Sequence, residues 1–83
     1  MGADNIAKGH MGIPVPDESV LEFVEGEVKR GGRLNGISAL SYLMRLQCPS
    51  AEQRAGLRLA LAMYGDRVDP AAQALLREAI ATH

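Results

Sequence analysis

The chain has few of the residues on which catalytic and metal sites depend. Its 83 residues include one cysteine, two histidines and no tryptophan. With Cys48 alone no intramolecular disulfide can form, and such cysteine usage is typical of a reducing cytoplasm, where we expect the protein. No cysteine and histidine cluster has zinc-site spacing. We therefore expect no enzymatic activity, no metal and no cofactor.

Long hydrophobic runs and a strong net charge are also missing. The longest apolar run, residues 59–64, is far shorter than the roughly 20 residues that cross a bilayer. The first 15 residues lack the apolar stretch of a signal peptide. A net charge of −1 argues against a protein that grips nucleic acid through its whole surface. We expect no membrane association and no direct nucleic-acid binding.

What remains is a short chain with a leucine- and alanine-rich core. Its length allows one domain, and a domain of this size buries only about 60% of the surface of its unfolded chain. Residues 1–10 show no periodicity, and the GHM at residues 9–11 resembles a cloning-site remnant. We expect residues 1–10 to be a vector-derived or disordered tail and residues 11–83 to be a single helical domain.

Four segments have helical periodicity and recognisable ends. Asp17 or Ser19 can cap the first helix, which a glycine pair at residues 31–32 stops. Asn35 can cap a second helix that reaches about residue 47. Ser50 and Gln53 form a capping-box pattern before a third helix that reaches about residue 64. A fourth helix is expected to begin at residue 70, which is a proline preceded by an aspartate.

The apolar positions predict how these helices pack. The second helix has a broad apolar face, made of Ile37, Leu40, Leu43, Met44 and Leu46. The third helix is apolar on more than one side, so we expect it to be central and well buried. Two prolines in the IPVP segment at residues 13–16 favour an extended arm. The expected fold is all-α, a compact array of four short helices with an extended N-terminal arm.

Charge is sorted along the chain. Residues 1–28 carry six acids against one lysine, and residues 29–58 carry six cations against one acid. Lys29 and Arg30 are explained by the end of the first helix, where cations suit the helix dipole, whereas Arg33 is not. Such charge sorting orients a protein partner more than it stabilises a fold.

Two kinds of binding surface compete with a purely structural interpretation. The tight turn at residues 48–50 and the arginines of the third helix resemble a helix-turn-helix, although that helix is too apolar to lie in a DNA groove. Tyr42, Tyr64, Met44 and Met63 are residue types favoured at protein interfaces. Protein binding is the expectation once catalysis is set aside.

From Met11 the chain begins MGIPVPDESVLEF and has 73 residues. In length, residue usage and lack of catalytic residues it resembles the small transcription regulators with which phages bind the RNA polymerase of a Xanthomonas host. The resemblance implies a protein that engages the polymerase β′ subunit, blocks σ-dependent initiation and promotes antitermination. A general interaction module (an adaptor or inhibitor) and a helix-turn-helix regulator remain the alternatives.

The resemblance supplies no binding residue, so candidates come from the residues themselves. We expect the partner to contact the apolar arm and the basic segment, and we expect the protein to be a monomer. We also expect that Arg33→Glu weakens partner binding and leaves the fold intact. The candidate contact residues are Ile13, Val15, Arg30, Arg33, Tyr42, Arg45, Arg54 and Arg58.

Overall fold

Four α-helices and one short 3-10 helix make up the computed structural model over residues 13–81, the part that is described. The elements are α2 (Glu18–Gly31), α3 (Gly36–Leu46), α4 (Ala51–Tyr64), η1 (Gly65–Arg67) and α5 (Pro70–Ala81). The prediction of an all-α fold with four short helices is confirmed. The prediction of a vector-derived or disordered tail at residues 1–10 lies outside the described residues.

The helix ends follow from local capping. The Asp17 side chain accepts a hydrogen bond from the Ser19 backbone N–H at 2.9 Å. In the same way Asn35 begins α3 by accepting from the Ser38 N–H at 2.8 Å. Because each cap satisfies a backbone N–H that has no partner inside the helix, the start of the helix is fixed by a few neighbouring residues.

The remaining boundaries are equally local. Ser50 and Gln53 form the reciprocal capping box that opens α4. At the end of α2, Gly32 adopts a left-handed conformation with φ of 85°, which glycine reaches without a steric penalty.

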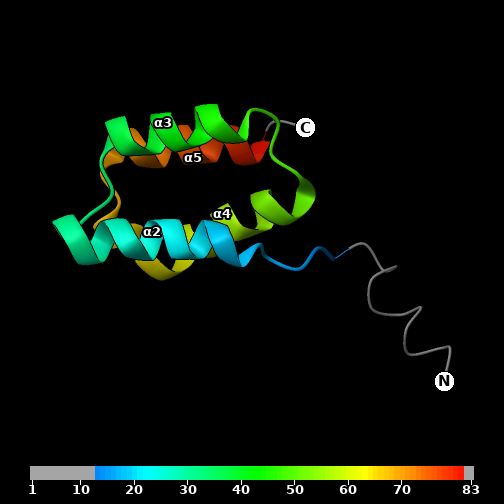
Figure 1. Ribbon diagram of the computed structural model, residues 1–83, viewed down its shortest axis with the longest axis horizontal. Helices are drawn as coiled ribbons and strands as arrows, with labels where there is room; N and C mark the ends of the chain where they lie inside the picture. Colours follow the sequence, from blue (N-terminus) through cyan, green and yellow to red (C-terminus); the bar gives the residue numbers. More distant parts are fainter. Residues whose placement is uncertain (1–12, 82–83) are drawn as a thin grey trace, which may run out of the picture.

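The helices pack in two layers, as Figure 1 shows. Helix α3 lies along α5 and α2 lies along α4, while α4 also contacts α5 and η1 and so joins the layers. The expectation that the third helix is central is therefore confirmed. It is not buried on every side, because Leu59 and Met63 are 36% and 55% exposed.

Two interhelical segments clamp the layers at one end. Leu34 and Val68 form an isolated parallel β-bridge and are both almost completely buried. The Leu34 N–H donates to the Arg67 carbonyl at 2.8 Å, and the Asp69 N–H donates to the Leu34 carbonyl at 2.9 Å. This pairing joins residues over 30 positions apart, so nothing in the local sequence predicted it.

Helices α2 and α4 approach each other closely at one point. Gly56 in α4 has no side chain, and a Cβ there would lie 2.9 Å from the Asp17 carbonyl oxygen and 3.0 Å from the Val20 Cβ. The Asp17 N–H also donates to the Glu52 carbonyl at 3.0 Å. The start of α2 therefore rests directly on the backbone of α4.

Arg33 contributes to this fold, which changes the expectation for its replacement. Its Nε donates to the Asp69 carboxylate, and the two side chains are 50% and 32% exposed. We now expect Arg33→Glu to lower the free energy of unfolding by about 0.5–1 kcal/mol, because it sets two carboxylates side by side. Urea unfolding measures this loss. The exchanged pair, Arg33→Asp with Asp69→Arg, should recover most of it, and a failure to recover would mean that the ion pair is not the cause.

Candidate protein-binding surface

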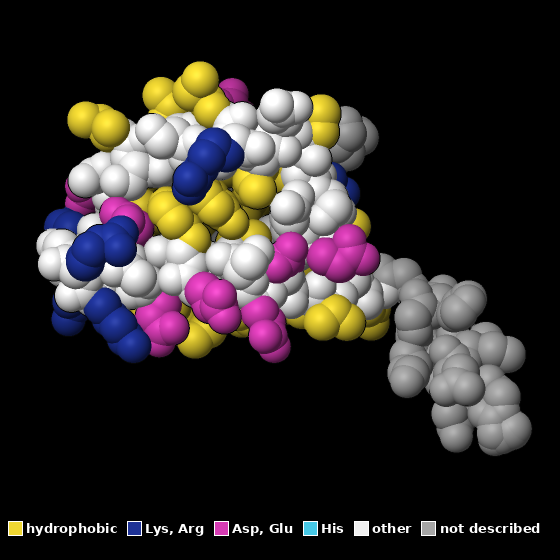
Figure 2. Space-filling model, in the orientation of Figure 1, with side chains coloured by type: hydrophobic (Ala, Val, Ile, Leu, Met, Phe, Trp, Pro, Cys, Tyr) yellow, Lys and Arg dark blue, Asp and Glu magenta, His cyan; other side chains and the backbone are white. Residues whose placement is uncertain are grey.

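Helix α3 presents an apolar stripe to solvent. Ile37, Leu40 and Met44 are 81%, 47% and 67% exposed. Residues spaced by three and four positions share one side of a helix, so the three side chains form a continuous row. Figure 2 shows hydrophobic side chains gathered over α3 at the top of the molecule. Single exposed apolar residues are ordinary, but a row on one helix marks a contact surface.

The row is exposed because a different side of α3 enters the core. Ala39 and Tyr42 are buried, with Tyr42 8% exposed. The Tyr42 ring stacks on Phe23 of α2, with ring centroids 3.9 Å apart and planes 5° from parallel. Tyr42, which the sequence placed among the candidate contact residues, is part of the core in the free protein, and its contact with a partner stays a prediction.

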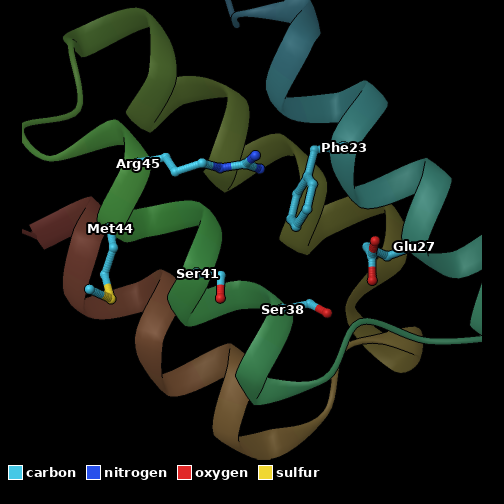
Figure 3. Close-up of a pocket in the computed structure, with 6 residues that line it drawn as sticks. All are labelled: Phe23, Glu27, Ser38, Ser41, Met44 and Arg45. Atoms are coloured by element: carbon cyan, nitrogen blue, oxygen red, sulfur yellow. The ribbon is translucent and has the colours of Figure 1, made fainter.

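An open groove runs between α2 and α3 on one side of the row. It has a volume of about 510 Å³. Figure 3 shows its lining side chains, with the Phe23 ring between the two helices. The Arg45 guanidinium carbon lies 5.7 Å from the centroid of the Tyr42 ring, at cation–π range. The lining residues are Phe23, Glu27, Ser38, Ser41, Met44 and Arg45.

A second groove lies on the other side of the row, between α3 and α5, with a volume of about 380 Å³. Leu40 and Met44 line it together with Leu75 and Ala79 of α5. Met44 borders both grooves, so α3 forms a ridge between two hollows. We call Ile37, Leu40 and Met44 with these two grooves the α3 surface. Its apolar ridge and polar edges have the composition of a protein interface.

The arm and one arginine lie where the sequence placed them, at the surface. Ile13 and Val15 are 79% and 74% exposed and precede α2 without helical structure. Arg30 is exposed in the last turn of α2 and pairs with Glu27. Lys29 pairs with Glu25 at 3.6 Å. Part of the charge sorting is thus neutralised within α2 itself.

The other arginines do not gather on one face. Arg33 pairs with Asp69, and Arg54 Nη1 donates to the Pro49 carbonyl at 2.9 Å. Arg45 borders the α2–α3 groove, whereas Arg58 lines a separate groove between α4 and α5. Arg33 and Arg54 therefore bind neighbouring segments of the chain, whereas Arg45 and Arg58 line two different grooves.

The arrangement of α3 and α4 does not suit a helix-turn-helix. In that motif the two helices pack on one another, whereas here α3 packs on α5 and α4 packs on α2 and α5. The face of α4 that holds Ala55, Leu57 and Ala60 is buried. Figure 2 shows acidic side chains along α2 and basic ones at its end, with no extended basic stripe on this face.

The periodicity of the sequence placed Ile37 and Leu40 on the broad apolar face of the second helix but did not identify them as contact residues. The apolar positions of α3 span about half of the helix circumference at roughly 100° per residue. That arc is wider than one packing contact needs. The width was the available signal that part of the face would remain exposed.

The buried Tyr42 predicts an alkaline instability. Burial and the negative charge of Asp17 raise the pKa of Tyr42, while a Ser19 hydrogen bond and Arg45 partly oppose the rise. Because the folded state holds the phenolic proton more tightly than the unfolded state, this stabilisation is lost as pH rises above about 10, the ordinary value. Thermal unfolding across this range should show a smaller alkaline loss for Tyr42→Phe. An equal loss in both proteins would exclude Tyr42 as its source.

Among residues 13–81, no group of histidine, cysteine, aspartate and glutamate side chains is placed to hold a metal ion. Within the same range no helix combines the length and the apolar character needed to span a bilayer. No protein family, curated protein or solved structure matches the chain.

Proposed function

We propose that this protein is a non-enzymatic transcription regulator that binds bacterial RNA polymerase through its β′ subunit. It acts by occupying a surface of the polymerase, and in doing so it inhibits σ-dependent initiation and promotes antitermination. The observation that carries the protein-binding part of the proposal is the exposed row of Ile37, Leu40 and Met44 on α3.

The row has the geometry of a helix that docks into a partner groove. Apolar anchors at positions i, i+3 and i+7 of one helix are a recurring mode of protein recognition. The two flanking grooves offer space for side chains of the partner beside Leu40 and Met44. A few such anchors in the centre of an interface supply most of its binding free energy.

Polymerase is proposed as the partner because of the resemblance of residues 11–83 to small phage regulators of this enzyme. The charge distribution supports an oriented encounter, since α2 carries four acids and α3 and α4 carry three arginines, and only Glu27 and Arg45 share one of the grooves described above. The exposed arm residues Ile13 and Val15 add a second apolar contact near α2.

The direct test mixes the purified full chain with purified RNA polymerase core and holoenzyme and follows co-elution by gel filtration. We expect a stable complex with core enzyme, loss of σ from the complex, and fewer promoter-dependent transcripts. A chain that elutes separately from both forms of the enzyme would exclude the proposal. The isolated β′ subunit, tested the same way, distinguishes it from the other subunits.

A general interaction module is the second candidate, and the same exposed row supports it. A second copy of the chain could cover the row and form a homodimer. Sedimentation of the free protein distinguishes the monomer that we expect from such a homodimer. A tight dimer that does not bind polymerase would favour the second candidate.

A further inference from the structure

A third groove, which shares no lining residue with the α3 surface, combines an apolar floor with two arginines. It lies between α4 and α5 and has a volume of about 390 Å³. Leu61, Ala62 and Ile80 supply its apolar lining. Arg58 of α4 and Arg77 of α5 line it from its two sides.

Within the part of the chain that the structure describes, neither arginine has a carboxylate partner. Among residues 13–81 no hydrogen bond or ion pair engages Arg58 or Arg77, and no acidic side chain lines this groove. Arg30 and Arg33 show the contrast, because each has a carboxylate partner. Glu78, which follows Arg77, lines the groove between α3 and α5 instead.

We propose that this groove binds an acidic peptide segment of a partner protein, in which carboxylates flank an apolar side chain. The two guanidinium groups can each pair with a carboxylate in the bidentate geometry that arginine favours. The apolar side chain covers Leu61 and Ile80, which are only half-buried in the free protein. This site is additional to the polymerase contact proposed for α3 and does not depend on it.

The lining favours a peptide over a nucleic acid. Single-stranded nucleic acids stack their bases on aromatic side chains, and no aromatic residue lines this groove. A phosphate backbone would pair with the arginines but would leave the apolar floor uncovered. An aliphatic side chain between two carboxylates satisfies both features at once.

The test titrates the isotopically labelled full chain, observed by NMR, with a synthetic peptide that has a leucine pair flanked on each side by glutamate. We expect shifts at the methyl groups of Leu61, Ala62 and Ile80 and at the guanidinium groups of both arginines. Arg58→Glu and Arg77→Glu should each weaken binding about tenfold. Both are exposed substitutions, and unchanged thermal unfolding confirms that the variants are folded.

Matched controls distinguish recognition of the peptide's charge from non-specific hydrophobic binding. The same peptide with glutamine in place of glutamate should bind at least tenfold more weakly, and a lysine version should bind the doubly reversed protein. Lys29→Glu, an exposed charge reversal at the end of α2 and outside every groove described above, should leave the affinity unchanged. The proposal is overturned if no shifts occur, if the glutamine peptide binds equally well, if the shifts centre on α3, or if a single-stranded oligonucleotide binds the groove more tightly than the peptide.

Discussion

Replacing Gly56 by alanine is expected to lower the free energy of unfolding by about 2 kcal/mol. In most helices this change is stabilising by about 1 kcal/mol, because alanine has the higher helix propensity. Here the new methyl group would lie 2.9 Å from the Asp17 carbonyl oxygen, a backbone atom that cannot rotate away. Overpacking of this kind costs up to about 3 kcal/mol, which outweighs the propensity gain.

Gly26→Ala is the matched control, because Gly26 lies inside α2 with nothing within 4 Å of the position of a new Cβ. It should stabilise the protein by about 1 kcal/mol. Thermal and urea unfolding of both variants measure the two effects. If Gly56→Ala were as stabilising as Gly26→Ala, α2 would not rest on α4 at this point.

The helix boundaries could be predicted from sequence because their causes are local. The caps at Asp17, Asn35 and Ser50 and the stop at Gly32 each depend on residues within four positions. The side chain and backbone groups that decide these ends are adjacent in the chain, so the residue types alone identify them. The predicted starts of α3, α4 and α5 agree with the structure to the residue.

The packing direction of α3 could not be predicted, because it depends on contacts between distant residues. The Phe23–Tyr42 stack and the Leu34–Val68 bridge decide which side of α3 faces inward. Neither contact leaves a local pattern. With an apolar arc wide enough for two orientations, the periodicity of α3 did not identify its buried side.

The roles of the arginines at the candidate site also depend on contacts that the sequence does not show. Charge sorting indicated a basic binding face, but three of its arginines already have roles in the free protein. Arg33 pairs with Asp69, Arg54 binds the Pro49 carbonyl, and Arg45 lies against the Tyr42 ring. A linear charge count cannot show such pairing, because the partners are set by the fold or by the turn that precedes a helix. The proposed binding surface therefore rests on exposed apolar residues and not on the basic residues that the charge sorting indicated.

Replacing Ile37 and Met44 together by serine should weaken binding to RNA polymerase by at least tenfold, and up to a hundredfold if both are central anchors. Both side chains are largely exposed, at 81% and 67%, so the free energy of unfolding should change by only about 0.5 kcal/mol. Binding is measured by titration of labelled protein with core enzyme. Unfolding of the variant in urea shows whether the fold is retained.

Met63→Ser provides the comparison, because Met63 is 55% exposed but lies on α4, away from the α3 surface. It removes a similar apolar side chain, so a general loss of hydrophobic adhesion would affect both proteins equally. A specific interface on α3 should leave the affinity of Met63→Ser near that of the unmodified chain. Equal losses in the two variants, or full binding by the double serine variant, would place the polymerase contact elsewhere and leave the arm residues Ile13 and Val15 as the next candidates.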